Sequence, residues 1–260
     1  MIPEILYSRK ESHGKTWAEI TLNRPEKGNA LTRPMLDELG RIVDEIAADS
    51  AVRAVVLRAN GRFFCTGGDI AEWGSLSPDD MAQKWILPGI EVFERIAQLP
   101  QPVIALLQGH TLGGGLELAL TADFRIAAAP AKFGTPEVTL GMIAGWHGIR
   151  SLAELIGVGR ARQMTLTGSL VTASDALAWG LVTDVAETTE GLDEHLEILL
   201  ATLLTNAPIA MAVTKSVLSS MHADLRHLHA SSVARVAGTE DCKEGVLAFL
   251  EKRKPSFQNH

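Results

Sequence analysis

Residues 102–123, PVIALLQGHTLGGGLELALTAD, decide the fold because they place an apolar strand directly before a glycine-rich helix start. The run from Pro102 to Leu107 is continuously apolar, as is typical of a strand buried on both faces. Three consecutive glycines, at 113–115, then open a helix, so backbone N–H groups lie there without side chains around them. The first turn of a helix carries unpaired N–H donors and the positive end of the helix dipole, which suit a developing negative charge. An oxyanion hole is one use of such a turn, and close packing of helix against strand is the other.

The order of strand, glycine-rich loop and helix occurs twice. Residues 53–60, RAVVLRAN, form another short apolar run, and GRFFCTGGDI follows at 61–70. If the two strands are parallel neighbours, both loops lie at the same edge of the sheet, where ligands bind in α/β folds. Two backbone N–H donors can then meet there. The pattern predicts an α/β protein with its site between these loops.

Flanking segments are consistent with this fold class. Residues 16–23 alternate like a half-buried strand, and a helix from about Arg33 places Leu36, Leu39, Val43 and Ile46 on one face. A helical stretch begins after Ser77, a candidate N-cap, and we expect Pro88–Gly89 to break it into two helices.

The second half of the chain changes in character near residues 187–191. Before this point, short strands at 123–128, 131–138 and 181–186 alternate with helices near 149–156, 160–166 and 174–180. From about Leu192 the pattern is helical to the end. We therefore expect a core at 1–190 and a helical C-terminal region at 191–260.

Composition restricts the classes of function. The 260 residues carry a formal net charge of -7, which argues against a general nucleic-acid or anionic-membrane binder. Cys65 and Cys242 lie far apart without disulfide or zinc-site spacing, so a reduced cytoplasmic setting is expected. We find no secretory signal and no apolar run long enough to cross a bilayer.

Glu117 and Glu137 are the candidate acid and base. Glu117 follows Gly114 by one helical turn, and Glu137 follows Pro136, whose restricted backbone can fix a carboxyl in place. Two carboxyls can divide acid and base roles between them. The alternative is that both are surface glutamates, since the chain has 31 acidic residues.

Six motifs, in order, resemble those of the crotonase (enoyl-CoA hydratase/isomerase) superfamily, and they span nearly the whole chain. They are LNRPEKGNAL (22–31), FFCTGGDI (63–70), QGHTLGGGLELALTADFRIA (108–127), FGTPEVTLGMIAG (133–145), LTGSLVTASDALAWGLV (166–182) and EGVLAFLEKRKPSF (244–257). The resemblance implies a spiral of repeated β-β-α units with a helical C-terminal trimerisation region. It also implies a homotrimer, or a dimer of trimers.

The resemblance further assigns site residues. The N–H groups of Gly68 and Gly114 bind the thioester oxygen of an acyl-CoA, Glu117 activates the water that attacks Cβ, and Glu137 delivers a proton to Cα. Coenzyme A belongs to the substrate, and no other cofactor and no metal is expected. The positions that match CoA contacts are Lys27, Gly28, Ala30, Thr66, Gly68, Ile70 and Gly114, with Phe249 and Lys252 from a neighbouring subunit.

One loop departs from the family pattern of proline, glycine, any residue and two glycines. It reads AGWHGI at 144–149, with Ala144 in place of proline and His147 in place of glycine. Trp146 and His147 either alter the acyl pocket or only pack. In this family, the region that covers the acyl chain matches positions Trp73, Met81, Trp85 and Ile86. An apolar helix face of this kind is also typical of a hydrophobic core.

Functions other than hydration of an enoyl-CoA stay open. A Δ3,Δ2-enoyl-CoA isomerase needs one base and gains nothing from a second carboxylate, so retention of both glutamates favours hydration. An RNA-binding member would need a lysine-rich helix, whereas the matching segment, EVFERIAQLPQ, carries two glutamates and one arginine. A catalytically silent scaffold is disfavoured by the two glutamates. Hydrolases, decarboxylases and ring-forming enzymes share the fold, which alone does not exclude them.

Overall fold

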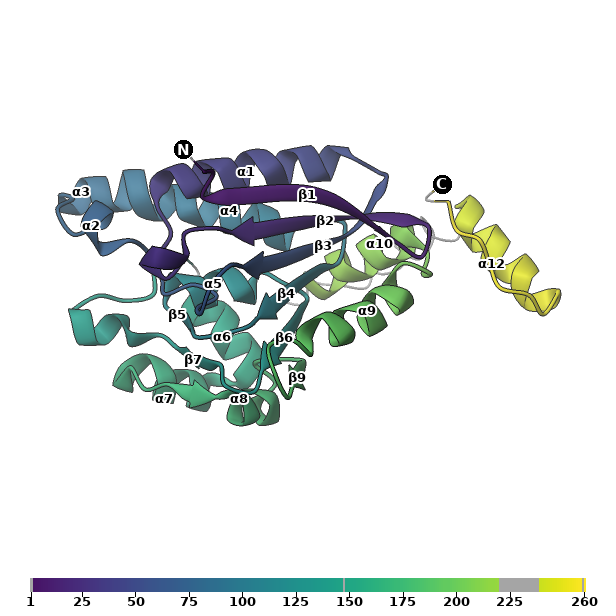
Figure 1. Ribbon diagram of the computed structural model, residues 1–260. Coiled ribbons are helices and arrows are strands. Elements are labelled where there is room, and N and C mark those ends of the chain that lie inside the picture. Colours follow the sequence, from purple (N-terminus) through teal and green to yellow (C-terminus); the bar gives the residue numbers. More distant parts are fainter. Residues whose placement is uncertain (1, 147, 220–238, 259) are drawn as a thin grey trace.

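The computed structural model describes residues 2–146, 148–219, 239–258 and 260. Its main sheet has six strands in the order β1-β2-β3-β4-β6-β9 (Figure 1). These strands are β1 (Ile5–Ser12), β2 (Lys15–Leu22), β3 (Val52–Ala59), β4 (Val103–Leu107), β6 (Phe124–Ala128) and β9 (Asp184–Ala186). The β1–β2 pair is antiparallel and the other pairs are parallel. The predicted α/β class is confirmed.

Strand β1 is an element that the sequence analysis missed. Its sequence, ILYSRKES, is charged in its second half and mostly half-buried or exposed, because β1 lies at the edge of the sheet. It pairs with β2 through a tight turn at His13 and Gly14, which both have positive φ angles of 53° and 69°. Positive φ angles at both residues are typical of the two-residue turns that join the strands of a β-hairpin.

The inner strands are buried on both faces, as their apolar runs predicted. Val55 and Leu57 of β3 face the larger core together with Val103 of β4, whereas Val56 and Ile104 face a smaller one. The strands pair in parallel with Val55 opposite Val103. Both strands therefore end at the same edge of the sheet, and the loops that follow them emerge together.

Helix α1 (Arg33–Ala48) covers the larger core. Thr32 caps it by accepting a hydrogen bond from the N–H of Met35 at 3.3 Å. The four residues predicted to share a face, Leu36, Leu39, Val43 and Ile46, are all buried. Helix α4 (Leu87–Ala97) packs beside α1 and buries Phe93 and Ile96 in the same core.

The predicted break at Pro88–Gly89 is wrong, because the chain stays helical from Pro78 to Ala97. A short α3 (Pro78–Asp80) leads into a π-helical segment, η2 (Met81–Ile86), and this continues directly into α4. Pro88 lies in the first turn of α4, where a missing N–H is tolerated. Proline has no N–H, so Pro88 cannot donate to the carbonyl of Lys84 four residues earlier. That carbonyl accepts a hydrogen bond from Arg33 Nη1 at 2.6 Å instead.

A second sheet, β5-β7-β8, lies beside the loops that follow β3 and β4. Its strands are β5 (Thr111–Leu112), β7 (Lys132–Gly134) and β8 (Val171–Thr172). The helices and turns around it are η1 (Pro25–Lys27), α2 (Ile70–Trp73), α5 (Gly114–Leu120), η3 (Pro136–Leu140), α6 (Gly148–Ile156), α7 (Val158–Thr167) and α8 (Ala173–Trp179). The predicted helices after residue 148 are confirmed within a few residues.

Helices α9 (Leu192–Leu203) and α10 (Pro208–Ser219) lie along the sheet (Figure 1). Leu196 and Leu200 of α9 pack against the smaller core, and Lys215 of α10 donates a hydrogen bond to Asp123 at 2.6 Å. In the described part of the chain, no single helix is both long and apolar enough to cross a membrane. Helices α9 and α10, bent by 105°, meet those criteria only as a pair.

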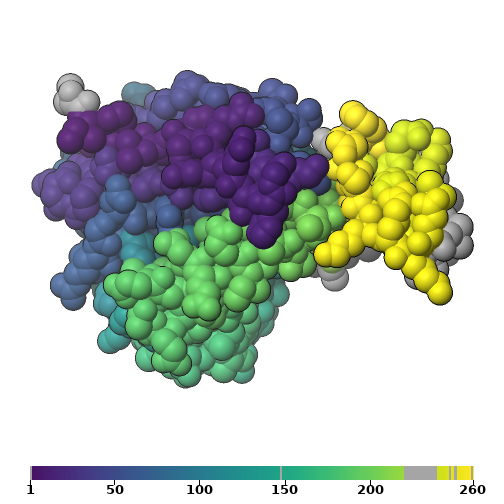
Figure 2. All heavy atoms as spheres, turned by 45° about the vertical axis from the view of Figure 1, so that its right-hand side comes forward, coloured from purple at the N-terminus to yellow at the C-terminus, as the bar shows by residue number. Residues whose placement is uncertain are grey.

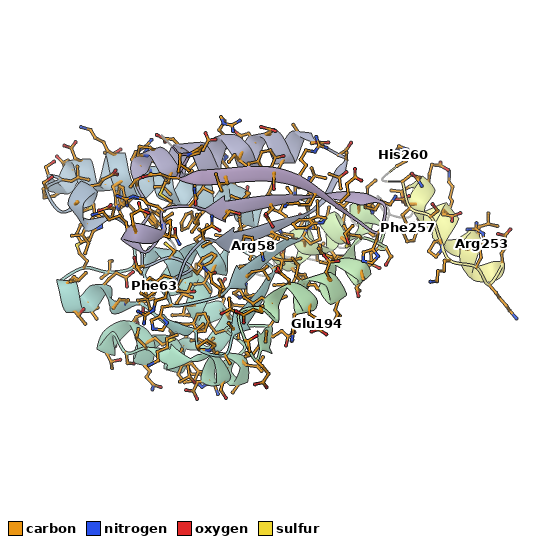
Figure 3. All side chains as sticks on the ribbon, in the orientation of Figure 1. Arg58, Phe63, Glu194, Arg253, Phe257 and His260 are labelled. Atoms are coloured by element: carbon orange, nitrogen blue, oxygen red, sulfur yellow. The ribbon has the colours of Figure 1, made fainter. Side chains whose placement is uncertain are left out.

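The C-terminal residues form a separate lobe. Helix α12 (Glu240–Leu250) and the chain after it stand off from the body (Figure 2). The chain after Leu250 is not helical, so the expectation of helix to the end is wrong there, and for residues 220–238 this expectation lies outside the described residues. Arg253 instead pairs with Glu244 at 2.6 Å, while Phe257 lies toward the hairpin turn, where its carbonyl accepts from Lys15 at 3.2 Å (Figure 3). The boundary near residues 187–191 stays a prediction.

Candidate active site

The two glycine-rich loops meet at the end of β3 and β4. The N–H of Leu112 donates to the carbonyl of Cys65 at 2.9 Å, which joins the loops. A Cβ added to Gly114 would lie 3.4 Å from the backbone nitrogen of Gly68, and one added to Gly67 would lie 3.5 Å from that of Gly114. The backbone nitrogens of Gly68 and Gly114 are therefore neighbours, as the sequence predicted.

Glycine is required in this junction for two reasons. Gly67 and Gly113 have φ angles of 113° and 53°, which side chains with a Cβ rarely adopt. A Cβ on Gly115 would lie 2.4 Å from the carbonyl oxygen of Cys65, a contact that only a backbone shift could relieve. Because α5 begins at Gly114, the N–H of that residue is one of those that have no partner within the helix.

Glu117 is buried one turn into α5, with only 3% of its surface exposed. Its Oε1 accepts hydrogen bonds from the backbone N–H groups of Trp146 and Gly148, each at 2.7 Å. A Cβ on Gly148 would lie 2.3 Å from Cγ of Glu117, so a glycine is needed there. Burial raises the pKa of Glu117 to about 7, the two N–H donors oppose this rise, and the nearby charge of Glu137 adds to it.

Glu137 approaches the same place from η3. A Cβ on Gly113 would lie 2.8 Å from Oε1 of Glu137, so this carboxyl lies directly against the glycine turn. Its Oε2 is buried and has no hydrogen-bond partner among the residues that the structure describes. Burial raises the pKa of this carboxyl as well. A buried carboxyl oxygen without a partner is costly to retain, which is typical of a site that awaits a ligand.

A cavity of about 100 Å³ joins these groups. Both glutamates line it, together with Gly68 and Gly114, so the structure brings the four proposed catalytic positions to one site. Thr66 and Ile70 also line it. Its remaining wall is largely apolar and consists of Gly67, Trp73, Met81, Trp85, Ile86, Gly113, Pro136, Leu140, Met142, Ile143, Gly145 and Trp146. Trp73, Met81, Trp85 and Ile86 thus line the cavity as well as pack against the core.

The first motif lies against the loop that carries Gly68. The carbonyl of Gly28 accepts from the N–H of Thr66 at 3.0 Å and from its hydroxyl at 3.2 Å. The carbonyl of Ala30 accepts from Arg24 at 3.1 Å. Lys27 is exposed beside these residues. The predicted CoA contacts of the first two motifs are therefore adjacent in space.

The C-terminal positions are not brought to the cavity within one chain. Lys252 is exposed at the end of α12, which lies away from α5 in Figure 1. Because the expectation for Phe249 and Lys252 concerns a neighbouring subunit, it stays a prediction. The side chain of Phe249 lies outside the described part of the structure, as does His147.

Sequence reasoning missed the pairing of Arg24 with Asp69. Arg24 donates to Asp69 at 2.6 Å, directly beside Gly68. The signal was a basic residue in LNRPEKGNAL and an acidic one in FFCTGGDI, whose proximity depends on the parallel register of β2 and β3. Across the residues that the structure describes, no group of three or more His, Cys, Asp or Glu side chains is placed to hold a metal ion.

Comparison with known proteins gives one consistent family. A family model described as enoyl-CoA hydratase/isomerase matches residues 12–260. The short-chain-enoyl-CoA hydratase of Clostridium acetobutylicum is 37% identical over 255 residues, which cover 96% of this chain and 97% of that protein. The crotonyl-CoA hydratase of Syntrophomonas wolfei is 37% identical over 245 residues, covering 92% and 94%. The crystal structure of an enoyl-CoA hydratase from Bacillus anthracis superimposes with a TM-score of 0.92 at 34% identity, covering 99% and 100% of the two chains.

Proposed function

Because the chain belongs to the enoyl-CoA hydratase/isomerase family, we propose that it is an enoyl-CoA hydratase, which adds water across the 2,3 double bond of an enoyl-CoA thioester. One observation carries the proposal. Two carboxyls, the buried Glu117 and the half-buried Glu137, line a single cavity with the backbone of Gly68 and Gly114. Hydration needs both a group that activates water and a group that supplies a proton, and a carboxyl can act as either.

In the proposed reaction, Glu117 takes a proton from water as the water oxygen bonds to Cβ of the substrate. Its Oε1 is held by two backbone N–H groups, so the other oxygen is the one available to water. The electrons of the double bond move toward the thioester carbonyl and form an enolate. Glu137, whose pKa is raised by burial, gives its proton to Cα. The product is a 3-hydroxyacyl-CoA, and the enzyme returns to its starting state when Glu117 releases its proton to solvent and Glu137 takes one up from solvent.

The N–H groups of Gly68 and Gly114 stabilise the enolate oxygen. Since the oxygen carries more negative charge in the enolate than in the substrate, the two donors lower the barrier rather than only tighten binding. In another class of enzyme, loss of one such donor costs about 3–4 kcal/mol of transition-state stabilisation. The proposal needs no cofactor other than the CoA that the substrate carries.

The test is an assay with crotonyl-CoA, in which hydration removes the absorbance of the conjugated thioester. Substitutions Glu117→Gln and Glu137→Gln should each lower kcat by about a hundredfold or more, the usual contribution of acid–base catalysis. Glu91→Gln, at an exposed position on α4, is the matched control and should leave kcat unchanged.

The isomerase alternative gives a different result. An isomerase moves one proton, so it would convert a 3-enoyl-CoA and leave crotonyl-CoA unchanged. Activity on the 3-enoyl thioester alone would overturn the proposal. The same would follow if both glutamate variants kept wild-type hydration.

We also propose that the protein forms a homotrimer, or a dimer of trimers, and that it lies in the cytoplasm. Large apolar side chains lie exposed on α7, including Val158 at 54% and Leu166 at 72%, which supports burial against another subunit. Cys65 and Cys242 are both free thiols, which supports a reducing compartment. Light scattering of the purified protein measures the assembly.

A further inference from the structure

Trp146 is a buried residue in the wall of the cavity. It is only 4% exposed, and its ring lies 5.4 Å from that of Trp85 and 5.2 Å from that of Phe93, measured between centroids. Trp85 belongs to the π-helical segment and Phe93 to α4. Trp146 and Trp85 therefore form an aromatic floor of the cavity, and Phe93 packs against Trp146.

The indole fits a socket made of glycines. A Cβ on Gly114 would lie 2.4 Å from its Cζ3, and a Cβ on Gly89 would lie 2.2 Å from its Nε1. A Cβ on Gly68 would lie 3.4 Å from its Cη2. The indole thus occupies space next to both residues whose N–H groups face the thioester oxygen in the proposed reaction.

Both ends of Trp146 are fixed. Its Nε1 donates to the carbonyl of Trp85 at 3.3 Å, and its backbone N–H donates to Glu117 at 2.7 Å. Rotation of the indole out of the socket would break the first bond and leave a buried polar group unpaired, which is costly. The floor is therefore rigid rather than a gate.

The space above this floor is small. A water-sized group needs about 10–15 Å³ of accessible cavity volume. A cavity of about 100 Å³ therefore admits about seven to ten heavy atoms. The thioester oxygen and sulfur and the reacting water take about three of these. What is left accommodates an acyl chain of about four to seven carbons.

We propose that Trp146 sets the acyl-chain length of this enzyme and restricts it to short-chain 2-enoyl thioesters. The inference rests on the proposed hydratase function and adds the substrate class. A longer chain would need the volume that the indole fills, because Glu117 and Glu137 fix where the double bond must lie. Discrimination comes from the overlap of the distal methylene groups with the indole, and each such group is worth about tenfold or more in kcat/KM.

The experiment compares kcat/KM for crotonyl-CoA, trans-2-hexenoyl-CoA and trans-2-decenoyl-CoA in the wild type, Trp146→Ala and Trp146→Phe. We expect the wild type to prefer crotonyl-CoA to decenoyl-CoA by at least about a hundredfold. Trp146→Ala should raise the ratio of decenoyl-CoA to crotonyl-CoA activity by at least about tenfold. Trp146→Phe retains a ring in the socket, so it should fold even if the alanine variant does not, and it should shift the ratio in the same direction by less.

Trp179→Ala is the matched control. Trp179 is half-buried outside the cavity, with the guanidinium of Arg160 5.3 Å from its ring centroid, so its removal should leave the chain-length ratio unchanged. Equal wild-type activity on crotonyl-CoA and decenoyl-CoA would overturn the inference and leave the proposed function intact. Unchanged ratios in both Trp146 variants would do the same. Failure to hydrate any of the three thioesters would instead overturn the proposed function.

Discussion

Arg24 donates a hydrogen bond of 2.6 Å from Nη1 to Oδ2 of Asp69, and this bond ties the turn after β2 to the loop that carries Gly68. Both side chains are only 14% exposed. The other oxygen of Asp69 accepts from the N–H of Ala71 at 2.9 Å, so the carboxylate also caps α2. Although burial raises the pKa of Asp69, its bonds to Arg24 and Ala71 bring the pKa below its ordinary value. The pair thus fixes one of the two proposed oxyanion donors.

Substitution Arg24→Met should lower kcat by about ten- to a hundredfold while raising KM by less. The reason is that a small displacement of the Gly68 N–H reduces the stabilisation of the enolate more than it reduces the binding of the substrate. Steady-state kinetics with crotonyl-CoA measure the split between kcat and KM. Arg41→Met, which removes only exposed ion pairs with Glu38 and Glu45, is the control and should change neither constant. An unaltered kcat in a folded Arg24→Met protein would contradict a positioning role.

Gly114→Ala and Gly115→Ala should both lower stability, but Trp146→Ala should restore stability only in the Gly114→Ala protein. The Cβ at 114 would meet the Trp146 indole at 2.4 Å, whereas the Cβ at 115 would meet the Cys65 carbonyl at 2.4 Å. Overpacking of this kind costs about 1–3 kcal/mol. Adding Trp146→Ala should therefore recover stability in the Gly114→Ala protein and not in the Gly115→Ala protein. Denaturant unfolding of the three single variants, Trp146→Ala included, and the two double variants gives the coupling energies. Equal coupling in both pairs would refute this contact.

Local sequence patterns accounted for the elements that bring the catalytic positions together. The apolar runs of β3 and β4 predicted neighbouring parallel strands, and the spacing from Gly114 to Glu117 predicted a carboxyl one turn into a helix. These predictions succeeded because each depends on residues close in sequence and on burial of a whole strand. Strand β1 was missed because an edge strand exposes charged side chains and lacks that burial.

Side-chain contacts between distant segments were outside the reach of the sequence. The indole of Trp146 lies against Gly68 and Gly89, and nothing in either segment indicates that partner. Pro88 suggested a helix break, yet Arg33 supplies a donor to the Lys84 carbonyl from another helix and the chain continues. Both outcomes depend on tertiary packing, which overrides local preference.

The pH dependence of kcat/KM should follow Glu117. Its pKa is raised to about 7, so the fraction able to accept a proton from water falls as the pH drops below about 7, and the activity falls with it. Glu91→Gln, at an exposed position on α4, is the control and should keep the wild-type limb. Profiles of log kcat/KM for both proteins test this. A wild-type limb near the ordinary glutamate pKa of 4.5 would be the contrary result.

The same carboxyl should make stability depend on pH. The pKa of Glu117 is about 7 in the folded state against 4.5 ordinarily, so the folded protein binds this proton more tightly than the unfolded chain does. The corresponding stability, about 3 kcal/mol, is fully present below about pH 4.5 and is lost as the pH rises through about 7. Glu117→Gln lacks this titration, so its free energy of unfolding relative to the wild type should increase by up to about 3 kcal/mol between acidic and mildly alkaline pH. Denaturant unfolding across that range measures the difference, with Glu91→Gln as a control whose difference should stay flat. If the Glu117→Gln difference is also flat, the buried carboxyl does not retain its proton in the folded state, and its proposed part in catalysis loses its electrostatic basis.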